Sequence, residues 1–415
     1  MRSIIAVFLL LHGAAHTAGF LTPWGLAPRG ADGARPPSLN ALLGGRIALS
    51  QGVARGLGLL WLVVGLLFAV VAVAWWMRVP WATGALVGIA LLSLLLSIAW
   101  WPLSRIGVFI NVALLVGLSG AGYRNFSADL TQARSAATRQ SLIALTALGP
   151  MEYAMAGEGD PVLVIHGTGG GWDQGLYAAG GLVAHGFQLI APSRFGYLRT
   201  PLPSDHSPAN EADAFAMLLD SLGVPRVAVI SFSAGTSPAL QFALRHPARV
   251  SSLVLMVPAA GGVMAPAAKG PPAFVMNVVL GSNLPFWLAL RYWPRTIAGI
   301  AAVPYALLDS LSPADREHYQ RGVEMILPIT SRRRGMINDA HNQSGGERPY
   351  AIEMLTVPTM LVSAEDDLYR TADVARHAAT RIPNAKLMIV RNGGHFLLGH
   401  DAEIWPAVAA FMRRD

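Results

Sequence analysis

Arg226-Val-Ala-Val-Ile-Ser-Phe-Ser-Ala-Gly235 is the stretch that decides the fold. The uncharged, β-branched run over 227–230 predicts a buried strand, and residues 236–246 predict a helix. A strand that turns abruptly into a helix lifts a serine hydroxyl clear of a sheet, which makes Ser233 a candidate nucleophile. The usual pattern is Gly-x-Ser-x-Gly, because small residues tolerate the strained turn. Ser231 replaces the first glycine, and since serine is also small, we interpret the stretch as a variant of this turn.

The composition divides the chain into two parts. Of the 415 residues, 53% are hydrophobic and only 13% are charged, which is too apolar for an ordinary soluble protein. The net charge of +7 belongs entirely to residues 1–124, which hold eight arginines and one acidic residue, Asp32. A basic excess on an apolar segment indicates orientation in a membrane, and we expect no nucleic-acid partner. The absence of cysteine excludes disulfides and thiol chemistry.

Residues 1–124 contain four uncharged stretches, each at least 18 residues long and close to the roughly 20 that cross a bilayer. The stretches are 3–28, 56–77, 79–104 and 106–123, and tryptophans mark their ends like an interfacial belt: Trp75, Trp76, Trp81, Trp100 and Trp101. We therefore predict a multi-pass protein of the cell membrane. Because five arginines fall on each side of the four spans, the positive-inside rule leaves the orientation open. A cleaved signal peptide is the alternative for the first stretch, although no Ala-x-Ala site follows it.

His12 and His16 lie four residues apart, on one face of the first predicted helix. Ionisable groups inside a membrane segment suggest a metal, haem or proton site. The alternative, which we favour, is a pair of neutral imidazoles hydrogen-bonded between helices, because no carboxylate or third ligand accompanies them in the spans. We expect no metal and no cofactor. Residues 125–144 predict an amphipathic connector between this transmembrane domain and a second domain over 145–415.

In the second domain the pattern changes to alternating strands and helices. Strands are predicted over 151–156, 161–165, 188–191, 227–230, 251–257, 359–363 and 386–390. Helices are predicted over 176–185, 209–222, 236–246, 371–382 and 402–412. This alternation predicts an α/β fold with a doubly wound, mostly parallel sheet. In such sheets the active site lies at the carboxyl ends of the strands.

Three further strand ends carry segments that suit the chemistry of a serine nucleophile. His166-Gly-Thr-Gly-Gly-Gly171 follows the second predicted strand, and its glycines let backbone amides approach a substrate oxygen. This is not a phosphate-binding P-loop, because no Gly-Lys-Ser/Thr follows. Glu365-Asp-Asp367 follows the sixth strand, where a carboxylate can orient a histidine. Asn392-Gly-Gly-His395 follows the last strand and supplies an imidazole.

These segments, in the order Ser, Asp, His, resemble the α/β-hydrolase superfamily over about residues 145–415. The resemblance implies a catalytic triad in which His395 takes the proton of Ser233 and an acid holds the imidazole tautomer. In the family the acid usually falls at the second position of the acidic pair, which favours Asp367 over Asp366. Residues 1–124 lie outside the resemblance.

The resemblance also implies an oxyanion hole made of the backbone N–H groups of Thr168 and Ala234. His166 and Gly167 are expected to support this turn, with His166 bracing it. Residues 191–197 resemble the Asp-x-Arg-Gly-x-Gly type of loop that follows the family's next strand, with Ser193 in place of the acid.

The roughly 100 residues between the fifth and sixth predicted strands lack strand alternation. Helices are predicted over 274–280, 284–292, 297–308 and 316–326. The family inserts a cap over the active site here, at about 260–350. The segment is aromatic, with Phe274, Phe286, Trp287, Tyr292, Trp293 and Tyr305. We expect core packing for most of these, and an apolar substrate pocket is the alternative for some. Residues 332–334, three arginines, predict a solvated charge run or, alternatively, a contact to anionic lipid headgroups.

The leading hypothesis is a membrane-tethered serine hydrolase, esterase-like or lipase-like, that cleaves an apolar ester or thioester through an acyl-enzyme. Its partners would be a small apolar, lipid-like substrate and the membrane lipid. A serine nucleophile argues against haloalkane dehalogenase and epoxide hydrolase chemistry, for which family members use aspartate. Two alternatives stay open. One is a carbon–carbon bond hydrolase or cofactor-free haloperoxidase with the same triad, and the other is a non-catalytic membrane protein that only binds a ligand.

Overall fold

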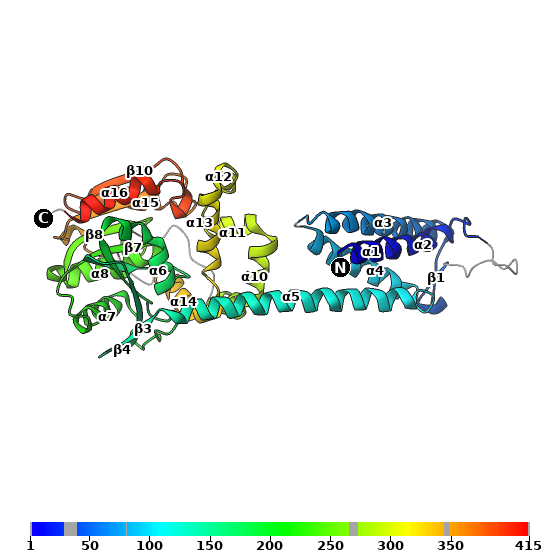
Figure 1. The fold of residues 1–415 in the computed structure, drawn as a ribbon, viewed down its shortest axis with the longest axis horizontal. Helices are drawn as coiled ribbons and strands as arrows, with labels where there is room; N and C mark the ends of the chain where they lie inside the picture. Colours follow the sequence, from blue (N-terminus) through cyan, green and yellow to red (C-terminus); the bar gives the residue numbers. More distant parts are fainter. Residues whose placement is uncertain (1, 29–39, 80, 265–272, 344–348, 414–415) are drawn as a thin grey trace. The chain divides into compact units, whose positions relative to one another are not determined.

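The computed structural model describes residues 2–28, 40–79, 81–264, 273–343 and 349–413. The chain forms two compact units, the first ending at Ser127 and the second beginning at Ala128. We call them the helical unit and the sheet unit (Figure 1).

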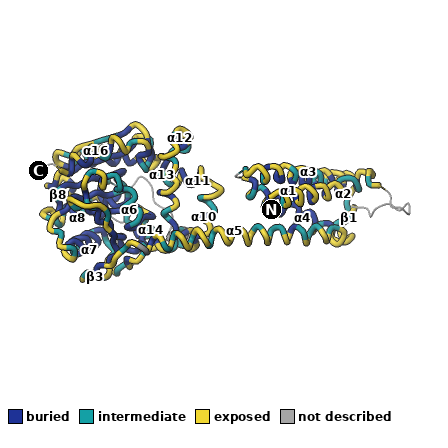
Figure 2. Tube along the Cα trace, in the orientation of Figure 1, coloured by how far each residue is buried: buried dark blue, intermediate teal, exposed yellow. Residues whose placement is uncertain are grey.

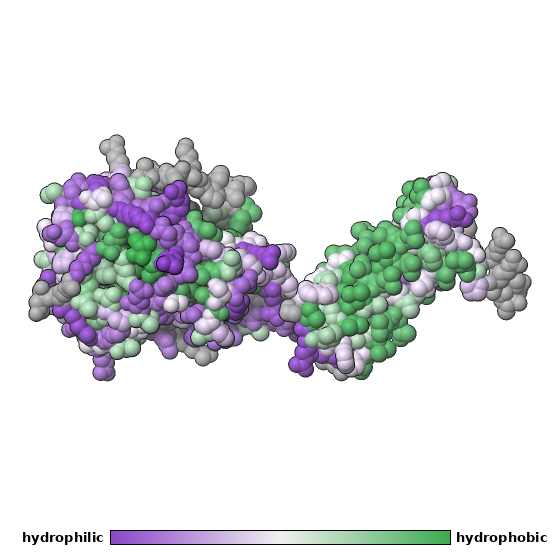
Figure 3. Space-filling view, turned by 90° about the horizontal axis from the view of Figure 1, so that it is seen from above, coloured by the Kyte–Doolittle hydropathy of each residue, from purple (hydrophilic) through white to green (hydrophobic). Residues whose placement is uncertain are grey.

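The helical unit consists of α-helices and one small antiparallel hairpin. Its elements are α1 (Arg2–Ala15), α2 (Thr17–Leu21), β1 (Ala41–Leu42), β2 (Ile47–Ala48), α3 (Gln51–Trp76), α4 (Ala82–Ala99) and the first part of α5 (Arg105–Arg139). Four helical segments among the described residues are long and apolar enough to cross a membrane: 2–21, 51–76, 82–99 and 105–138. Figure 3 shows a broad hydrophobic surface on this unit, with hydrophilic groups near its ends. Length and composition thus agree with the four expected spans.

Small residues allow α1 and α3 to approach closely. A Cβ placed on Gly13 would lie 2.7 Å from the carbonyl oxygen of Gly65, and one on Gly65 would lie 2.7 Å from that of Gly13. Glycine at both positions is therefore required by the backbone contact, as is common where membrane helices pack.

Only some of the tryptophans expected to form an interfacial belt have exposed side chains. Trp76, Trp81 and Trp101 expose their side chains, as an interfacial position requires. Trp100 is buried and its ring lies edge-on to that of Trp61, and Trp75 packs against the same core. Adjacent tryptophans at a helix end point in different directions, so one of each pair turns into the bundle.

The sheet unit is built on eight strands in the order β10-β9-β8-β7-β5-β6-β4-β3. The strands are β3 (Leu142–Thr146), β4 (Gly149–Ala156), β5 (Asp160–Ile165), β6 (Phe187–Pro192), β7 (Val227–Phe232), β8 (Val250–Met256), β9 (Thr359–Ala364) and β10 (Lys386–Val390). β4 pairs antiparallel with the edge strand β3 on one side and with β6 on the other. All the pairs from β6 to β10 are parallel. The mostly parallel, doubly wound sheet is confirmed.

Helices cover both faces of this sheet. The helices are α6 (Trp172–Ala178), α7 (Pro208–Ser221), α8 (Thr236–Arg245), α15 (Thr371–Arg381) and α16 (Asp401–Met412). Alternate residues of β5 face opposite sides. Leu163 joins the core under α7, α8 and α15, while Val162 joins the core under α6 and α16. Figure 2 shows the strands buried between these layers.

In the described part of the insertion between β8 and β9, six further helices lie to one side of the sheet, as the mainly yellow group in Figure 1. They are α9 (Ala273–Val279), α10 (Asn283–Tyr292), α11 (Pro294–Ile300), α12 (Tyr305–Ser310), α13 (Pro313–Glu324) and α14 (Arg333–His341). The single helix expected over 297–308 is wrong, because Ala302 adopts φ +52° and Pro304 follows, which separates α11 from α12.

The connector expected over 125–144 also differs from the structure. It is helical through Arg139, and β3 begins at Leu142. The side chain of Trp172 donates from Nε1 to the carbonyl of Ala137 at 3.2 Å, so the end of α5 packs on the sheet unit. The predicted end of the connector at residue 144 falls inside β3, an apolar strand whose partner, β4, follows after a short turn.

Candidate active site

Ser233 stands in the strained turn that the sequence predicts. β7 ends at Phe232, and Ser233 has φ +49°, a left-handed conformation that costs a non-glycine residue roughly 1–2 kcal/mol. Helix α8 begins at Thr236, whose hydroxyl donates to the Ser233 carbonyl at 2.7 Å. A Cβ on Gly235 would lie 2.6 Å from the carbonyl oxygen of Ile165, so glycine is needed beside β5. Tertiary packing therefore holds this serine at the carboxyl end of the sheet.

The glycine-rich turn after β5 packs directly against this serine. A Cβ on Gly167 would lie 3.1 Å from the Cβ of Ser233. His166 is buried; its Nε2 accepts the backbone N–H of Arg194 at 3.0 Å, so Nδ1–H donates to the Gly167 carbonyl at 2.7 Å. Burial, together with the nearby Arg194 charge, lowers the pKa of His166 well below its usual value. A neutral His166 thus connects the turn to the backbone of Arg194, and its supporting role in the site stays a prediction.

The expected oxyanion donors are the backbone N–H groups of Thr168 and Ala234. Each directly follows one of the two residues in contact, Gly167 and Ser233, so the two amides belong to turns that touch each other. Backbone amides in this position suit an oxygen that becomes negative during reaction. Their role as an oxyanion hole stays a prediction.

The ends of β9 and β10 bring an acid and an imidazole together. His395 Nδ1 lies 2.7 Å from Oδ2 of Asp367, whose side chain is fully buried. The hydroxyl of Thr371 donates to the same oxygen, and the backbone N–H of Tyr369 donates to Oδ1 at 2.9 Å. The Tyr369 ring also stands edge-on to the imidazole, with the ring centroids 5.1 Å apart. These contacts fix the orientation of both members of the pair.

Asp366 has a different contact. Its Oδ1 accepts the backbone N–H of Gly394 at 2.8 Å, so it supports the turn that carries His395 and not the imidazole itself. The insertion supports the same region, because the carbonyl of Ala302 accepts the N–H groups of Leu368 and His395, each at 3.3 Å. The contacts agree with the preference for Asp367 as the acid, whose catalytic role stays a prediction.

A buried ionic cluster, which the sequence analysis missed, links the glycine-rich turn after β5 to α14. Arg194 is buried and lies 3.1 Å from Glu211 and 2.8 Å from Asp339. Asp339 Oδ2 also accepts the hydroxyls of Thr168, at 2.9 Å, and Tyr197, at 2.6 Å. Three charged residues so far apart in sequence gave no signal that they would pair.

Another buried carboxylate, that of Glu152, lies beside the loop after β6, where the resembled loop has its own acid. Ser193 stands where the resembled loop has an acid, and its hydroxyl donates to Glu152 Oε2 at 3.0 Å. Glu152 comes from the neighbouring strand β4 and is fully buried. It also contacts Arg199 at 2.6 Å and accepts the Ser141 hydroxyl at 2.7 Å. The charge is therefore supplied by another strand, which sequence comparison within the loop cannot reveal.

The expectation for residues 332–334 is wrong for the first arginine. Arg332 is completely buried, with its guanidinium 2.7 Å from Asp173 and donating to the carbonyl of Gly170 at 2.6 Å. It is thus neither solvated nor free for lipid, and it ties the insertion to the glycine-rich turn. Of the three arginines only Arg334 is exposed.

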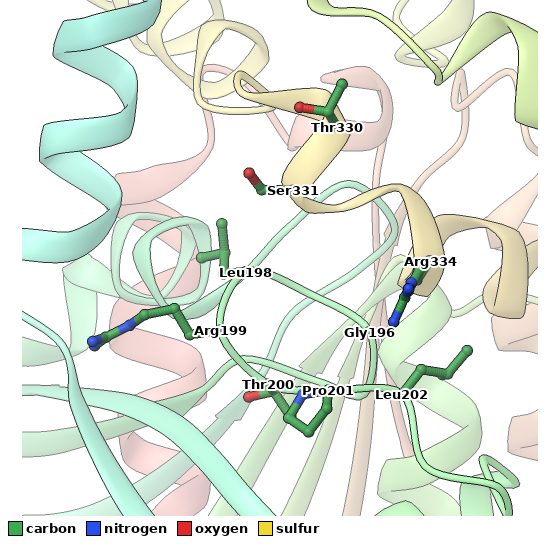
Figure 4. A pocket seen from close by; sticks show the side chains of 9 residues that line it. All are labelled: Gly196, Leu198, Arg199, Thr200, Pro201, Leu202, Thr330, Ser331 and Arg334. Atoms are coloured by element: carbon green, nitrogen blue, oxygen red, sulfur yellow. The ribbon is translucent and has the colours of Figure 1, made fainter.

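A pocket of about 270 Å³ lies between the loop after β6 and the segment before α14 (Figure 4). Its lining residues are Gly196, Leu198, Arg199, Thr200, Pro201, Leu202, Thr330, Ser331 and Arg334. None of these comes from the Ser233, Asp367 or His395 turns, and none is an aromatic residue of the insertion. An apolar substrate pocket lined by some of these aromatic residues therefore stays a prediction.

His12 and His16 form a satisfied polar network within the helical unit. The Nδ1–H of His16 donates to the His12 carbonyl at 2.8 Å, and its Nε2 lies 2.8 Å from the Ser93 hydroxyl. Asn111 donates to Ser93 at 2.7 Å, while its Oδ1 lies 3.2 Å from His12 Nε2. The network joins α1, α4 and α5, which agrees with the structural interpretation of the two histidines.

The comparisons with known proteins agree with this geometry. The family model of the alpha/beta hydrolase fold matches residues 160–401, more than half of the chain, and the chain belongs to this family. It is 27% identical over 268 residues to the hydrolase YcgS of Bacillus subtilis, covering 61% of this chain and 91% of that protein. It is 28% identical over 250 residues to the 2-hydroxymuconate semialdehyde hydrolase of Pseudomonas putida, covering 60% and 84%.

Among solved structures, the chain is similar to an alpha/beta hydrolase fold protein from Nakamurella multipartita. The TM-score is 0.56 at 27% identity, and the match covers 66% of this chain and 99% of that one. The family match begins at residue 160, so the helical unit lies outside it. The predicted fold and the assignment to the hydrolases are confirmed for the sheet unit.

Proposed function

We propose that this chain is a membrane-attached serine hydrolase that cleaves an apolar ester or thioester through an acyl-enzyme on Ser233. The observation that carries the proposal is the strained serine, with φ +49°, which follows the carboxyl end of β7, while the His395–Asp367 pair follows the carboxyl ends of β10 and β9 in the same sheet. A strained backbone at a strand end is costly, and such strain is characteristic of functional sites.

The proposed reaction uses the side chains in sequence. His395 Nε2 takes the proton of Ser233 as its Oγ attacks the carbonyl carbon, and Asp367 stabilises the imidazolium through Nδ1–H. The amides of Thr168 and Ala234 stabilise the oxyanion. The imidazolium then protonates the leaving group, and an activated water releases the acid and regenerates the serine.

Membrane attachment is supported by the four apolar helices and by their hydrophobic surface. An enzyme held at a bilayer meets substrates dissolved in it at a raised local concentration. An apolar or lipid-like substrate is therefore the class that this arrangement favours.

The similar proteins support a second candidate, hydrolysis of a carbon–carbon bond. Several relatives at 24–28% identity are named 2-hydroxy-6-oxononadienedioate hydrolase or 2-hydroxymuconate semialdehyde hydrolase, which are enzymes of the carbon–carbon bond hydrolase class. The triad is common to both chemistries, so the site itself does not discriminate between them.

A labelling experiment followed by a substrate panel tests the proposal. The full-length chain should react with a fluorophosphonate probe, and Ser233→Ala should lose the label while Ser231→Ala keeps it. Label that persists in Ser233→Ala contradicts the nucleophile. Turnover of short and long acyl esters, but not of 2-hydroxymuconate semialdehyde, supports the ester hydrolase; the opposite result supports the second candidate.

A further inference from the structure

One edge of the insertion exposes aromatic and basic side chains together. All six residues of Arg291-Tyr-Trp-Pro-Arg-Thr296, at the junction of α10 and α11, are exposed. The side chain of Trp293 is 57% exposed, and that of Ile300, at the end of α11, is 56% exposed. Leu284, at the start of α10, is also exposed. We call Leu284, the 291–296 segment and Ile300 the cap edge. Core packing was expected for most of the six aromatic residues of the insertion, and Tyr292 and Trp293 are two that do not follow it.

The helices that carry the cap edge are otherwise firmly packed. Trp287 of α10 is buried, as are Ile297 and Ala298 of α11, which contribute to the core of the insertion. The backbone N–H of Ile297 donates to the Trp293 carbonyl at 3.1 Å, so the corner between the helices is held in place. The exposed residues are thus the outer face of an ordered pair of helices.

The charge of this part of the insertion has one sign. No Asp or Glu occurs between residues 273 and 308, whereas Arg291 and Arg295 flank the exposed Tyr-Trp pair. Arg291 lies over the ring of Trp287 and Arg295 over that of Tyr305, at 5.6 and 4.6 Å from the ring centroids. Acidic residues occur from Asp309 onward, in α12 and in α13, so the stretch that carries the cap edge differs in charge from the helices that follow it.

This composition matches one kind of partner. Trp and Tyr prefer the headgroup level of a bilayer, and Arg beside them interacts with anionic headgroups. α10 is attached to the helix that carries the last candidate span, because Trp287 Nε1 donates to Asp129 at 2.8 Å, and Asp129 lies on α5 just after the apolar stretch that ends at Tyr123. α10 is therefore fixed to the segment by which the chain enters the sheet unit.

We propose that the cap edge docks on a lipid bilayer surface, with Tyr292 and Trp293 in the headgroup region and Arg291 and Arg295 on anionic lipids. This inference rests on the membrane attachment in the proposed function and adds the surface through which the sheet unit contacts lipid. A surface so placed would bring the insertion, whose Ala302 supports the His395 turn, next to substrates in the bilayer.

Because the chain has no cysteine, single-cysteine variants can report lipid contact in the full-length protein. Leu284→Cys and Ile300→Cys carry an environment-sensitive fluorophore on the cap edge, while Met354→Cys and Leu387→Cys are exposed controls on the sheet unit. Leu66→Cys on α3 is also exposed and reports the helical unit. Each is reconstituted in nanodiscs of phosphatidylglycerol and phosphatidylcholine with or without doxyl-labelled lipid.

The proposal expects lipid quenching of roughly half or more of the fluorescence at Leu284, Ile300 and Leu66, and little at the two controls. Trp293→Asp should sharply reduce quenching at Ile300 without changing that at Leu66. Quenching at Leu66 but not on the cap edge overturns the docking surface alone. So does a cap edge whose fluorophores are shielded from water but not quenched by lipid, which indicates contact with a second copy of the chain. An unquenched Leu66 overturns membrane attachment and docking together. Fluorophosphonate labelling is measured separately, so a failure of the serine chemistry is distinguishable from all of these outcomes.

Discussion

Nδ1 of His395 lies 2.7 Å from Oδ2 of Asp367, although the two residues are 28 positions apart in the sequence. They meet because β10 and β9 are parallel neighbours, so the turns at their carboxyl ends are adjacent. The preceding residue, Asp366, points instead to the Gly394 backbone. Two consecutive residues of the acidic turn thus have different partners: the Asp367 carboxylate contacts the imidazole, and the Asp366 carboxylate accepts a backbone N–H.

The two carboxylates should respond differently to neutralisation. Asp367→Asn removes the charge that stabilises the imidazolium and should lower kcat by on the order of 10⁴. Asp366→Asn should lower it far less, because it affects only the support of the turn. Ester turnover by both variants, with fluorophosphonate labelling rates, measures the difference. A larger loss in Asp366→Asn would mean that the acid is assigned to the wrong position.

Backbone strain at Ser233 should appear as a difference in unfolding free energy between variants at this position. Glycine accepts φ +49° without the clash of a Cβ, so Ser233→Gly should be more stable than Ser233→Ala by about 1 kcal/mol. Thermal unfolding of both inactive variants gives the comparison. Ser231→Ala is the matched control: its buried hydroxyl has no hydrogen-bond partner within the described part of the chain, so its loss should not lower the unfolding temperature. Equal stability of the glycine and alanine variants would show that the turn is unstrained.

The cluster around Asp339 should be important for stability and for the oxyanion turn. Asp339→Asn leaves the buried Arg194 with one carboxylate and should destabilise the sheet unit by about 3–5 kcal/mol. Thr168→Val removes only one hydroxyl bond to the same carboxylate, so it should cost about 1 kcal/mol. Denaturant unfolding measures both. Similar losses in the two variants would argue against a buried charge as the cause.

The neutral, buried His166 predicts a pH dependence of stability. Its pKa is held well below the value of about 6.5 that an unfolded chain would show, so below that pH the unfolded state binds a proton that the folded state does not. Stability from this group is complete above pH 6.5 and falls at lower pH by up to about 1.4 kcal/mol per unit. Unfolding free energies between pH 5 and 7 should have a smaller slope in His166→Gln. Parallel curves for the two proteins would assign the dependence to other groups.

The structure also sets where a separate sheet unit should begin. A fragment starting at Ala128 keeps the Trp172 contact to Ala137 and the whole of β3. It should fold in mild detergent and react with the fluorophosphonate probe. A fragment starting at Ala144 cuts β3 and removes Ser141 from Glu152, so it should aggregate or fold poorly. Circular dichroism and probe labelling compare the two, and equal behaviour would show that the segment before Ala144 is dispensable.

Several features could be predicted from local pattern alone. The run over 227–230 and the turn around Ser233 fixed a strand, a bend and a helix, because β-branched residues and small residues constrain the backbone locally. The glycine-rich turn at 166–171 and the order of the three strand-end segments indicated the family, which the family match confirms. The apolar lengths of the first four helical segments required only composition.

Other features depended on contacts between distant residues. Arg332 looked like one of three solvated arginines, and only the fold shows that it is buried against Asp173. Glu152 supplies the carboxylate that Ser193 lacks, because β4 pairs with β6. β3 was missed within the predicted connector, and its pairing with β4 is seen only in the fold. The sequence did not distinguish Trp293 from the other aromatic residues of the insertion, and only the fold shows that it is exposed while Trp287 is buried. Sequence by itself determined the local backbone and the order of the chemical groups, since propensity and periodicity act over a few residues. Only the tertiary structure decided which charges pair and which side chains face outward, because burial and ion pairing depend on neighbours far away in the chain.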